Sequence, residues 1–106
     1  MSSLQHVKKF IKKIKPENIK FKHHFFERVR ERPISEEMVR KYLKKTNHLV
    51  NVENQPSRNE GEEKYKIWLK LSNKYSLVLI VAIRKKDLYI ITGWNTNRKW
   101  QKSIQR

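Results

Sequence analysis

The stretch YKIWLKLSNKYSLVLIVAIR, residues 65–84, decides the fold. In its first seven residues apolar side chains alternate with Lys66, Trp68 and Lys70, which is the period of a β-strand with two unlike faces. Residues 75–84 are almost continuously apolar and rich in Val and Ile, as in a central strand buried on both faces. The polar residues 72–74 between them predict a turn. The stretch therefore predicts two antiparallel neighbours at the centre of a sheet.

The flanking sequence extends this pair into a single domain of 106 residues. Shorter strands are predicted at 49–53 and 88–94, and helices at 4–15, 23–31 and 35–45 precede the strands. Because the helices come first and the strands follow, we expect an α+β domain with N-terminal helices packed on a four-stranded antiparallel sheet. A short C-terminal helix is predicted at 97–106, with Asn97 as its cap. Residues 19–22 are a further strand candidate.

The third helix has the clearest local signals. Ser35 is a favourable N-cap, and Glu36 and Glu37 suit the positive N-terminal end of a helix. Ile34 and Val39 are spaced as a hydrophobic staple across that start.

The helix at 4–15 is amphipathic, with Leu4, Val7, Ile11 and Ile14 on one side and lysines over much of the rest. Such a helix can lie on a membrane surface. We favour the alternative, in which it packs on the domain and its lysines are solvated.

The composition is strongly basic, with 26 Lys and Arg, 10 Asp and Glu, and a net charge of +16. A phosphate backbone offsets such a charge well, because each neutralised phosphate releases a condensed counterion. An anionic membrane is the competing partner. The sequence has no Cys and only two Gly, which excludes disulfides, thiolate chemistry and a Gly-rich phosphate loop. No metal or cofactor is expected. The longest apolar run is too short to span a bilayer, so we expect a cytoplasmic protein.

Residues 22–34 hold the most informative polar pattern. On a helix, Phe25, Phe26 and Val29 would form the buried side. His24, Arg28 and Arg32 are four residues apart and would form a stripe along its edge. A neutral imidazole accepts a proton, and guanidinium groups hold a phosphate. The alternative is an exposed helix whose arginines pair with its own glutamates.

Two later segments carry candidate binding residues. An aromatic ring among lysines on a strand suits single-stranded nucleic acid; alternatively, Trp68 packs under a helix beneath lysine stems, which we favour. Residues 89–100 leave a strand for a polar turn and a helix start, where polar groups can hold an anion. The predicted nucleic-acid contacts of all these segments are Lys22, Lys66, Trp68, Lys70, Trp94, Thr96, Arg98 and Lys99.

The motif of His24, Arg28 and Arg32 followed by Ile-Ser-Glu-Glu resembles the RelE/ParE-type toxin superfamily, and is most similar to a RelE-like subgroup related to BrnT toxins. The resemblance covers residues 19–94, with Pro33 where the family usually has Gly. It implies a compact α+β fold and, for many members, metal-independent RNA cleavage.

The resemblance implies a toxin-like endoribonuclease in which the RNA 2′-hydroxyl attacks the adjacent phosphate and leaves a cyclic phosphate. His24 would transfer protons, Arg28 and Arg32 would stabilise the phosphorane, and Thr92 would shape the substrate site. An acidic antitoxin protein is then a further expected partner. The alternative is a non-catalytic RNA- or DNA-binding module, and a membrane role ranks last.

Overall fold

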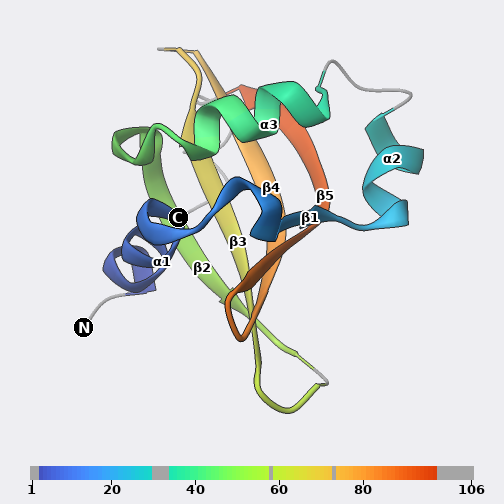
Figure 1. Ribbon diagram of the computed structural model, residues 1–106. Helices are drawn as coiled ribbons and strands as arrows, with labels where there is room; N and C mark the ends of the chain where they lie inside the picture. Colours follow the sequence, from blue (N-terminus) through green and yellow to red (C-terminus); the bar gives the residue numbers. More distant parts are fainter. Residues whose placement is uncertain (1–2, 30–33, 58, 73, 98–106) are drawn as a thin grey trace.

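A computed structural model of the chain describes residues 3–29, 34–57, 59–72 and 74–97. The side chains of Arg28, Val29, Thr96 and Asn97 are not described. The elements, drawn in Figure 1, are three α-helices, two single-turn 3₁₀ helices and five strands: α1 (Ser3–Lys13), η1 (Pro16–Asn18), β1 (Ile19–Phe21), α2 (His23–Val29), α3 (Glu36–Leu43), η2 (Thr46–His48), β2 (Leu49–Gln55), β3 (Glu62–Lys70), β4 (Tyr75–Arg84) and β5 (Asp87–Asn97).

The sheet confirms the α+β class but corrects its topology. Its strand order is β1-β5-β4-β3-β2, so it has five strands and not the expected four. The strands β2 to β5 form the predicted antiparallel meander. The short strand β1 joins β5 in parallel, with Ile19 opposite Leu88, which makes the sheet mixed. Sequence patterns predict a strand at 19–22 but not its partner, because the two segments are far apart in the chain.

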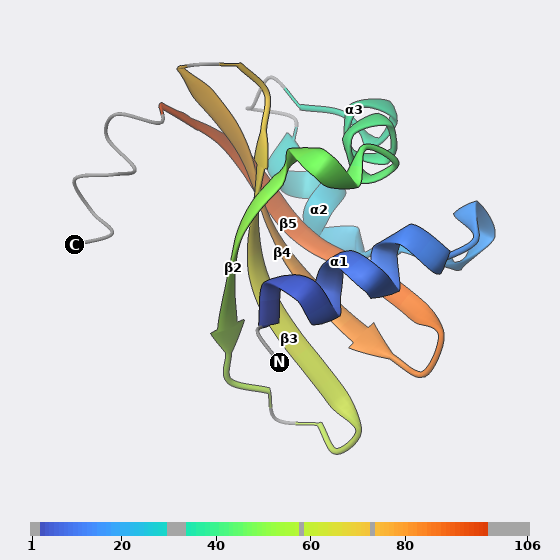
Figure 2. The same cartoon turned by 90° about the vertical axis from the view of Figure 1, so that its left-hand side faces the viewer.

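The helices all lie on one side of the sheet (Figure 2), and the main core lies beneath them. The strands β3, β4 and β5 contribute Ile67, Leu79 and Ile90, which have no solvent exposure. From α1, Val7 and Ile11 join the same core cluster. Thus α1 packs on the domain with its apolar side, as predicted, and that side is not free to enter a membrane. In the part of the chain that the structure describes, no helix has the length and apolar character to cross a bilayer.

The helix α2 is anchored by one aromatic side chain. Phe25 is fully buried and packs edge-on against Phe21, with ring centroids 4.9 Å apart. Phe26, which was predicted to be buried beside it, is 43% exposed. The prediction was wrong because α2 is short and lies at the β1 edge of the sheet, where the sheet covers only a narrow side of the helix.

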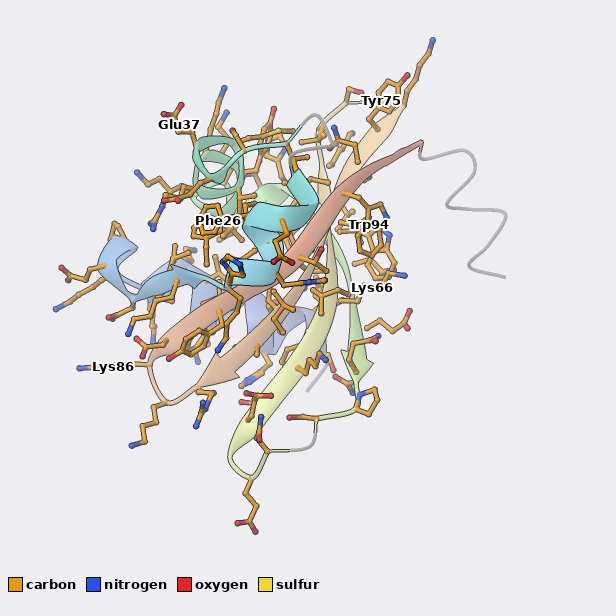
Figure 3. All side chains as sticks on the ribbon, turned by 90° about the vertical axis from the view of Figure 1, so that its right-hand side faces the viewer. Phe26, Glu37, Lys66, Tyr75, Lys86 and Trp94 are labelled. Atoms are coloured by element: carbon orange, nitrogen blue, oxygen red, sulfur yellow. The ribbon has the colours of Figure 1, made fainter. Side chains whose placement is uncertain are left out.

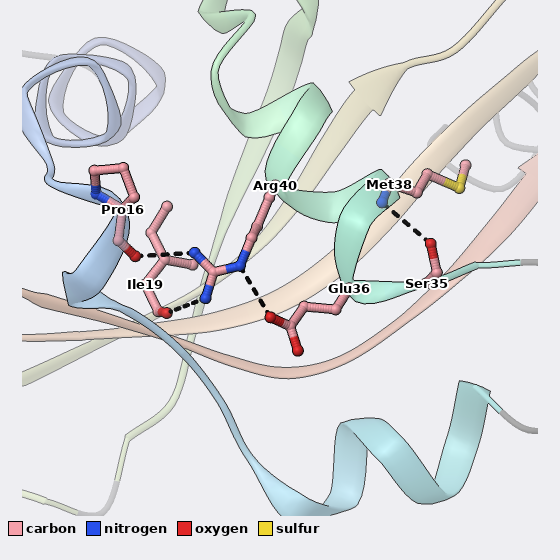
Figure 4. Close-up of polar contacts among 6 residues, drawn as sticks. All are labelled: Pro16, Ile19, Ser35, Glu36, Met38 and Arg40. Atoms are coloured by element: carbon pink, nitrogen blue, oxygen red, sulfur yellow. Dashed lines mark hydrogen bonds and ion pairs between the residues drawn. The ribbon is translucent and has the colours of Figure 1, made fainter.

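The start of α3 confirms the predicted cap. The Ser35 hydroxyl accepts a hydrogen bond of 3.1 Å from the Met38 backbone N–H (Figure 4), and Ile34 and Val39 are both buried. Such a cap stabilises a helix by about 1 kcal/mol.

Arg40 of α3 ties this helix to the segment that precedes β1. Its guanidinium donates to the carbonyls of Pro16 at 2.9 Å and Ile19 at 3.0 Å, while Glu36 accepts from its Nε at 3.0 Å (Figure 4). Bonds to two carbonyls fix the place of the guanidinium geometrically. The side chain therefore helps to hold β1 at the edge of the sheet.

The last strand is longer than predicted. It continues through Trp94 to Asn97 and pairs with β4 to its end, where a polar turn was expected. The predicted helix at 97–106 lies, apart from Asn97, outside the described residues. Gly93 lies within β5 where a Cβ atom would come within 2.6 Å of Leu79 Cδ2 and 3.1 Å of the Val78 carbonyl oxygen, so a larger residue there would require the Leu79 side chain to shift.

Candidate nucleic-acid interface

The strand registers divide the side chains of the sheet into two sets. Lys66 of β3 is opposite Ile80 of β4, which is opposite Thr92 of β5, so these three share the face that no described helix covers (Figure 2). We call it the helix-free face. By the same registers and strand alternation it comprises Asn51, Glu53 and Gln55 of β2, Lys64, Lys66, Trp68 and Lys70 of β3, Ser76, Val78, Ile80 and Ala82 of β4, and Tyr89, Thr92 and Trp94 of β5.

A lysine flanked by two tryptophans lies near the middle of this face. Lys66 Nζ is 5.0 Å from the centroid of the Trp68 ring and 5.5 Å from that of Trp94. Figure 3 shows Lys66 and Trp94 together on one side of the sheet, with Phe26 and Glu37 on the other. A cation over an aromatic face gains about 0.5–1 kcal/mol at exposed sites, so the ammonium is held beside both rings.

The two tryptophans differ in exposure. Trp68 is only 3% exposed, whereas Trp94 is partly exposed. The favoured expectation that Trp68 packs under a helix is wrong, because the helices lie on the opposite face. Trp68 is nevertheless buried, and it lies outside the core cluster beneath the helices. Of the two rings, only that of Trp94 has solvent-exposed surface that a ligand could contact. Trp68 is buried and contacts the same lysine.

A second group of cations and an aromatic ring lies at the β1 end of the same face. Lys22 Nζ is 4.7 Å from the centroid of the Tyr89 ring, and Lys20 Nζ is 5.9 Å from it. Tyr89 was not predicted as a site residue. The signal that would have found it is the parallel pairing of Lys20 with Tyr89, which depends on the unpredicted place of β1.

The helix α2 carries the predicted catalytic histidine on the other side. The His24 side chain is 49% exposed, and its Nδ1 lies 3.9 Å from Glu27 Oε2. The neighbouring His23 is 86% exposed and pairs with the same carboxylate at 3.0 Å. Both histidines thus face an acidic side chain of their own helix. The alternative that the arginines pair with the glutamates of this helix concerns side chains outside the described part of the chain.

Of the predicted catalytic side chains, the structure describes only those of His24 and Thr92, and it does not bring them together. Thr92 lies on the helix-free face, whereas α2 packs on the helix-covered face, so the sheet lies between the helix of His24 and the Thr92 side chain. Thr92 therefore does not complete a site around His24, which corrects that expectation. The Arg28 side chain and all of Arg32 lie outside the described residues.

Most of the predicted nucleic-acid contacts lie together on one face of the sheet. Lys22, Lys66, Trp68, Lys70 and Trp94 all lie on the helix-free face. Thr96 is in register with Ser76 on this face, but its side chain is not described. Arg98 and Lys99 lie outside the described residues.

Two groups at the start of β3 have shifted pKa values. Burial, aided by the hydrogen bond to Glu63, raises the pKa of Tyr65 to about 12. The hydrogen bond from Ser57 lowers the pKa of Glu62. Glu62 lies at the β2–β3 hairpin, whereas Tyr65 precedes Lys66 in β3 and its side chain lies in the core on the opposite face. Among the described residues, no three His, Asp or Glu side chains gather in a way that could hold a metal ion.

Comparison with known proteins adds no relative: no family model, curated protein or solved structure matches the chain.

Proposed function

We propose that this protein binds single-stranded RNA on the helix-free face of its sheet. The observation that carries the proposal is the position of Lys66 between Trp68 and Trp94. A base can stack on the accessible Trp94 ring while the ammonium of Lys66 contacts the adjoining phosphate. Stacking of this kind contributes about 1–3 kcal/mol per base and tolerates any sequence.

The charge on this face supports the same proposal. Lys64 and Lys70 flank Lys66 along β3, and Glu53 of β2 is opposite Lys66. The partly exposed ring of Trp94 lies beside Lys66, so the lysines of β3 place positive charge next to an aromatic ring. A single strand can turn its bases toward the sheet, whereas a duplex keeps its bases stacked inside. The choice of RNA over DNA rests on the resemblance to RelE-like ribonucleases, since both nucleic acids offer bases and phosphates.

The experiment is a titration of a fluorescent single-stranded RNA with the protein, read by anisotropy at several salt concentrations. The duplex of the same sequence and the corresponding single-stranded DNA are the comparison ligands. We expect the single-stranded RNA to bind most tightly, with log affinity falling linearly against log salt. Equal or tighter binding of the duplex would contradict stacking on Trp94.

RNA cleavage is a second candidate, favoured by the surroundings of His24. Its ring is half exposed, and Glu27 beside Nδ1 can hold the imidazole in one orientation. In the proposed step the 2′-oxygen forms a bond to phosphorus as its proton passes to the imidazole. The bond to the 5′-oxygen breaks, and this oxygen takes a proton from water and leaves as a 5′-hydroxyl, so that a cyclic phosphate remains. Such proton transfer contributes about 10²–10⁴-fold in rate.

His23 provides the matched control for this candidate. It is adjacent to His24, more exposed and paired with the same carboxylate. RNA is incubated with the wild type, His24→Ala and His23→Ala in EDTA, and the cleavage products are followed over time. We expect cleavage to be lost in His24→Ala and retained in His23→Ala. Absence of cleavage by the wild type, or equal loss in both variants, would end the catalytic candidate and leave the binding proposal untouched.

A further inference from the structure

A groove of about 430 Å³ lies at the C-terminal end of α1, beside the turn between β4 and β5. Its size is within the range of pockets that hold small ligands. It is lined by two unlike groups of side chains, four lysines and a short apolar surface: His6, Lys9, Phe10, Lys13, Ile14, Lys15, Asn18 and Lys86.

The lysines make this groove a site for a multiply charged anion. Lys9 and Lys13 come from α1, Lys15 from the segment after it, and Lys86 from the β4–β5 turn. No acidic side chain is among the described residues that line the groove. The lysines are exposed, so an anion gains their attraction without first breaking buried ion pairs.

The apolar floor of the groove, formed by Phe10 and Ile14, distinguishes it from a patch of surface lysines alone. Phe10 and Ile14 are partly buried and pack against the core, which holds them in place. A planar apolar ring can lie against them while its charged groups reach the lysines. His6 adds a polar ring at the lining, with its Nε2 3.0 Å from Glu63 Oε1.

We propose that this groove binds a nucleoside phosphate, with the base on Phe10 and Ile14 and the phosphates among the four lysines. The ligand class follows from charge complementarity together with the apolar floor. The groove is separate from the Lys66 group. Figure 3 shows Lys86 at the end of the sheet on the side of α1, with Lys66 and Trp94 on the other side.

The ligand test uses ADP as the probe, with the full-length chain in a calorimetric titration. Pyrophosphate and adenosine are the comparison ligands, because each keeps one half of the proposed recognition. We expect saturable ADP binding at least about tenfold tighter than either fragment, equal to about 1.4 kcal/mol. Absence of saturable ADP binding, or pyrophosphate bound as tightly as ADP, would overturn the assignment.

Two neighbouring lysines locate the site. Lys13 lines the groove and Lys12 does not, although both are exposed residues of α1. Lys13→Glu and Lys12→Glu produce the same net charge. We expect Lys13→Glu to weaken ADP binding about tenfold and Lys12→Glu by less than about threefold, as expected for a local ion pair and not for overall charge. Equal losses would contradict a site in this groove.

Phe10→Leu tests the floor while keeping an apolar side chain against the core. The affinity for ADP should fall while the affinity for pyrophosphate stays unchanged, and equal changes for both ligands would count against base stacking here. RNA affinity is measured on the same variants. Since the RNA proposal concerns the other side of the sheet, failure of one proposal leaves the other standing.

Discussion

The two faces of the central strands differ in what covers them and in what they hold. On the helix-covered face Ile67, Leu79 and Ile90 pack against α1, α2 and α3 and have no solvent exposure. On the helix-free face Lys66, Trp94 and Thr92 occupy the alternate positions of the same strands. Alternate positions of one strand therefore have different surroundings. Ile67 and Leu79 are buried beneath the helices, whereas Lys66, Thr92 and Trp94 are partly exposed on the other face.

Trp68 belongs to the fold although it lies on the helix-free face. It is 3% exposed, so Trp68→Ala should lower the free energy of unfolding by about 3–5 kcal/mol. Denaturant unfolding followed by circular dichroism measures the loss. A variant as stable as the wild type would show that Trp68 is a surface residue and free to stack on bases.

Leu79→Ala removes a side chain from the helix-covered face and should cost about 2–5 kcal/mol of stability. RNA affinity, measured where the variant is still folded, should not change, because the substitution leaves the helix-free face intact. A folded Leu79→Ala protein that has lost RNA binding would break the division between the faces.

Trp94→Ala acts on the partly exposed ring. RNA affinity should fall by about 1–3 kcal/mol through lost stacking, with a smaller effect on stability than Trp68→Ala. Trp94→Phe keeps an aromatic ring and should recover most of the affinity. If the alanine variant binds RNA as well as the wild type does, Trp94 is not the stacking ring.

Tyr65 gives the smallest effect, through pH. Its folded-state pKa of about 12 lies above the ordinary value of 10.0. The folded state therefore holds the phenol proton more tightly than the unfolded state. The associated stability is present below pH 10 and is lost as the pH rises from 10 through 12. In the Tyr65→Phe variant the free energy of unfolding should fall less steeply between pH 10 and pH 12 than in the wild type. The same slope in both proteins would contradict the raised pKa of Tyr65.

Local signals predicted much of the fold. The Ser35 cap depends on residues within one helical turn, and the strands β3 and β4 are marked by their own alternation and continuous apolar run. The pairing of β1 with β5 was not predicted, because the local sequence of a strand does not show which distant strand it will pair with. Phe26 was misplaced for a similar reason, since the width of the surface that covers a helix is set by the rest of the fold.

The site was predictable to a smaller extent. Alternation along β3 placed Lys66 and Trp68 on one side, but only the sheet register brings Trp94 to the same lysine. The whole fold also determines which face of the sheet the helices cover. For this reason the sequence did not show that Trp68 lies on the face without helices. The separation of Thr92 from α2 follows from the same property, because a sequence motif does not show on which side of a sheet its members lie.

Charge reversal on the two sides of the sheet tests the central claim most directly. Lys66 lies over Trp68 on the helix-free face, and Lys41 of α3 lies 5.8 Å from the centroid of the Tyr42 ring on the helix side. Lys66→Glu and Lys41→Glu give proteins of equal net charge, and anisotropy titration measures the affinity of each for the same single-stranded RNA. We predict a loss of about tenfold or more for Lys66→Glu and less than about threefold for Lys41→Glu. Equal losses would show that RNA responds to net charge alone and would contradict a binding site on the helix-free face.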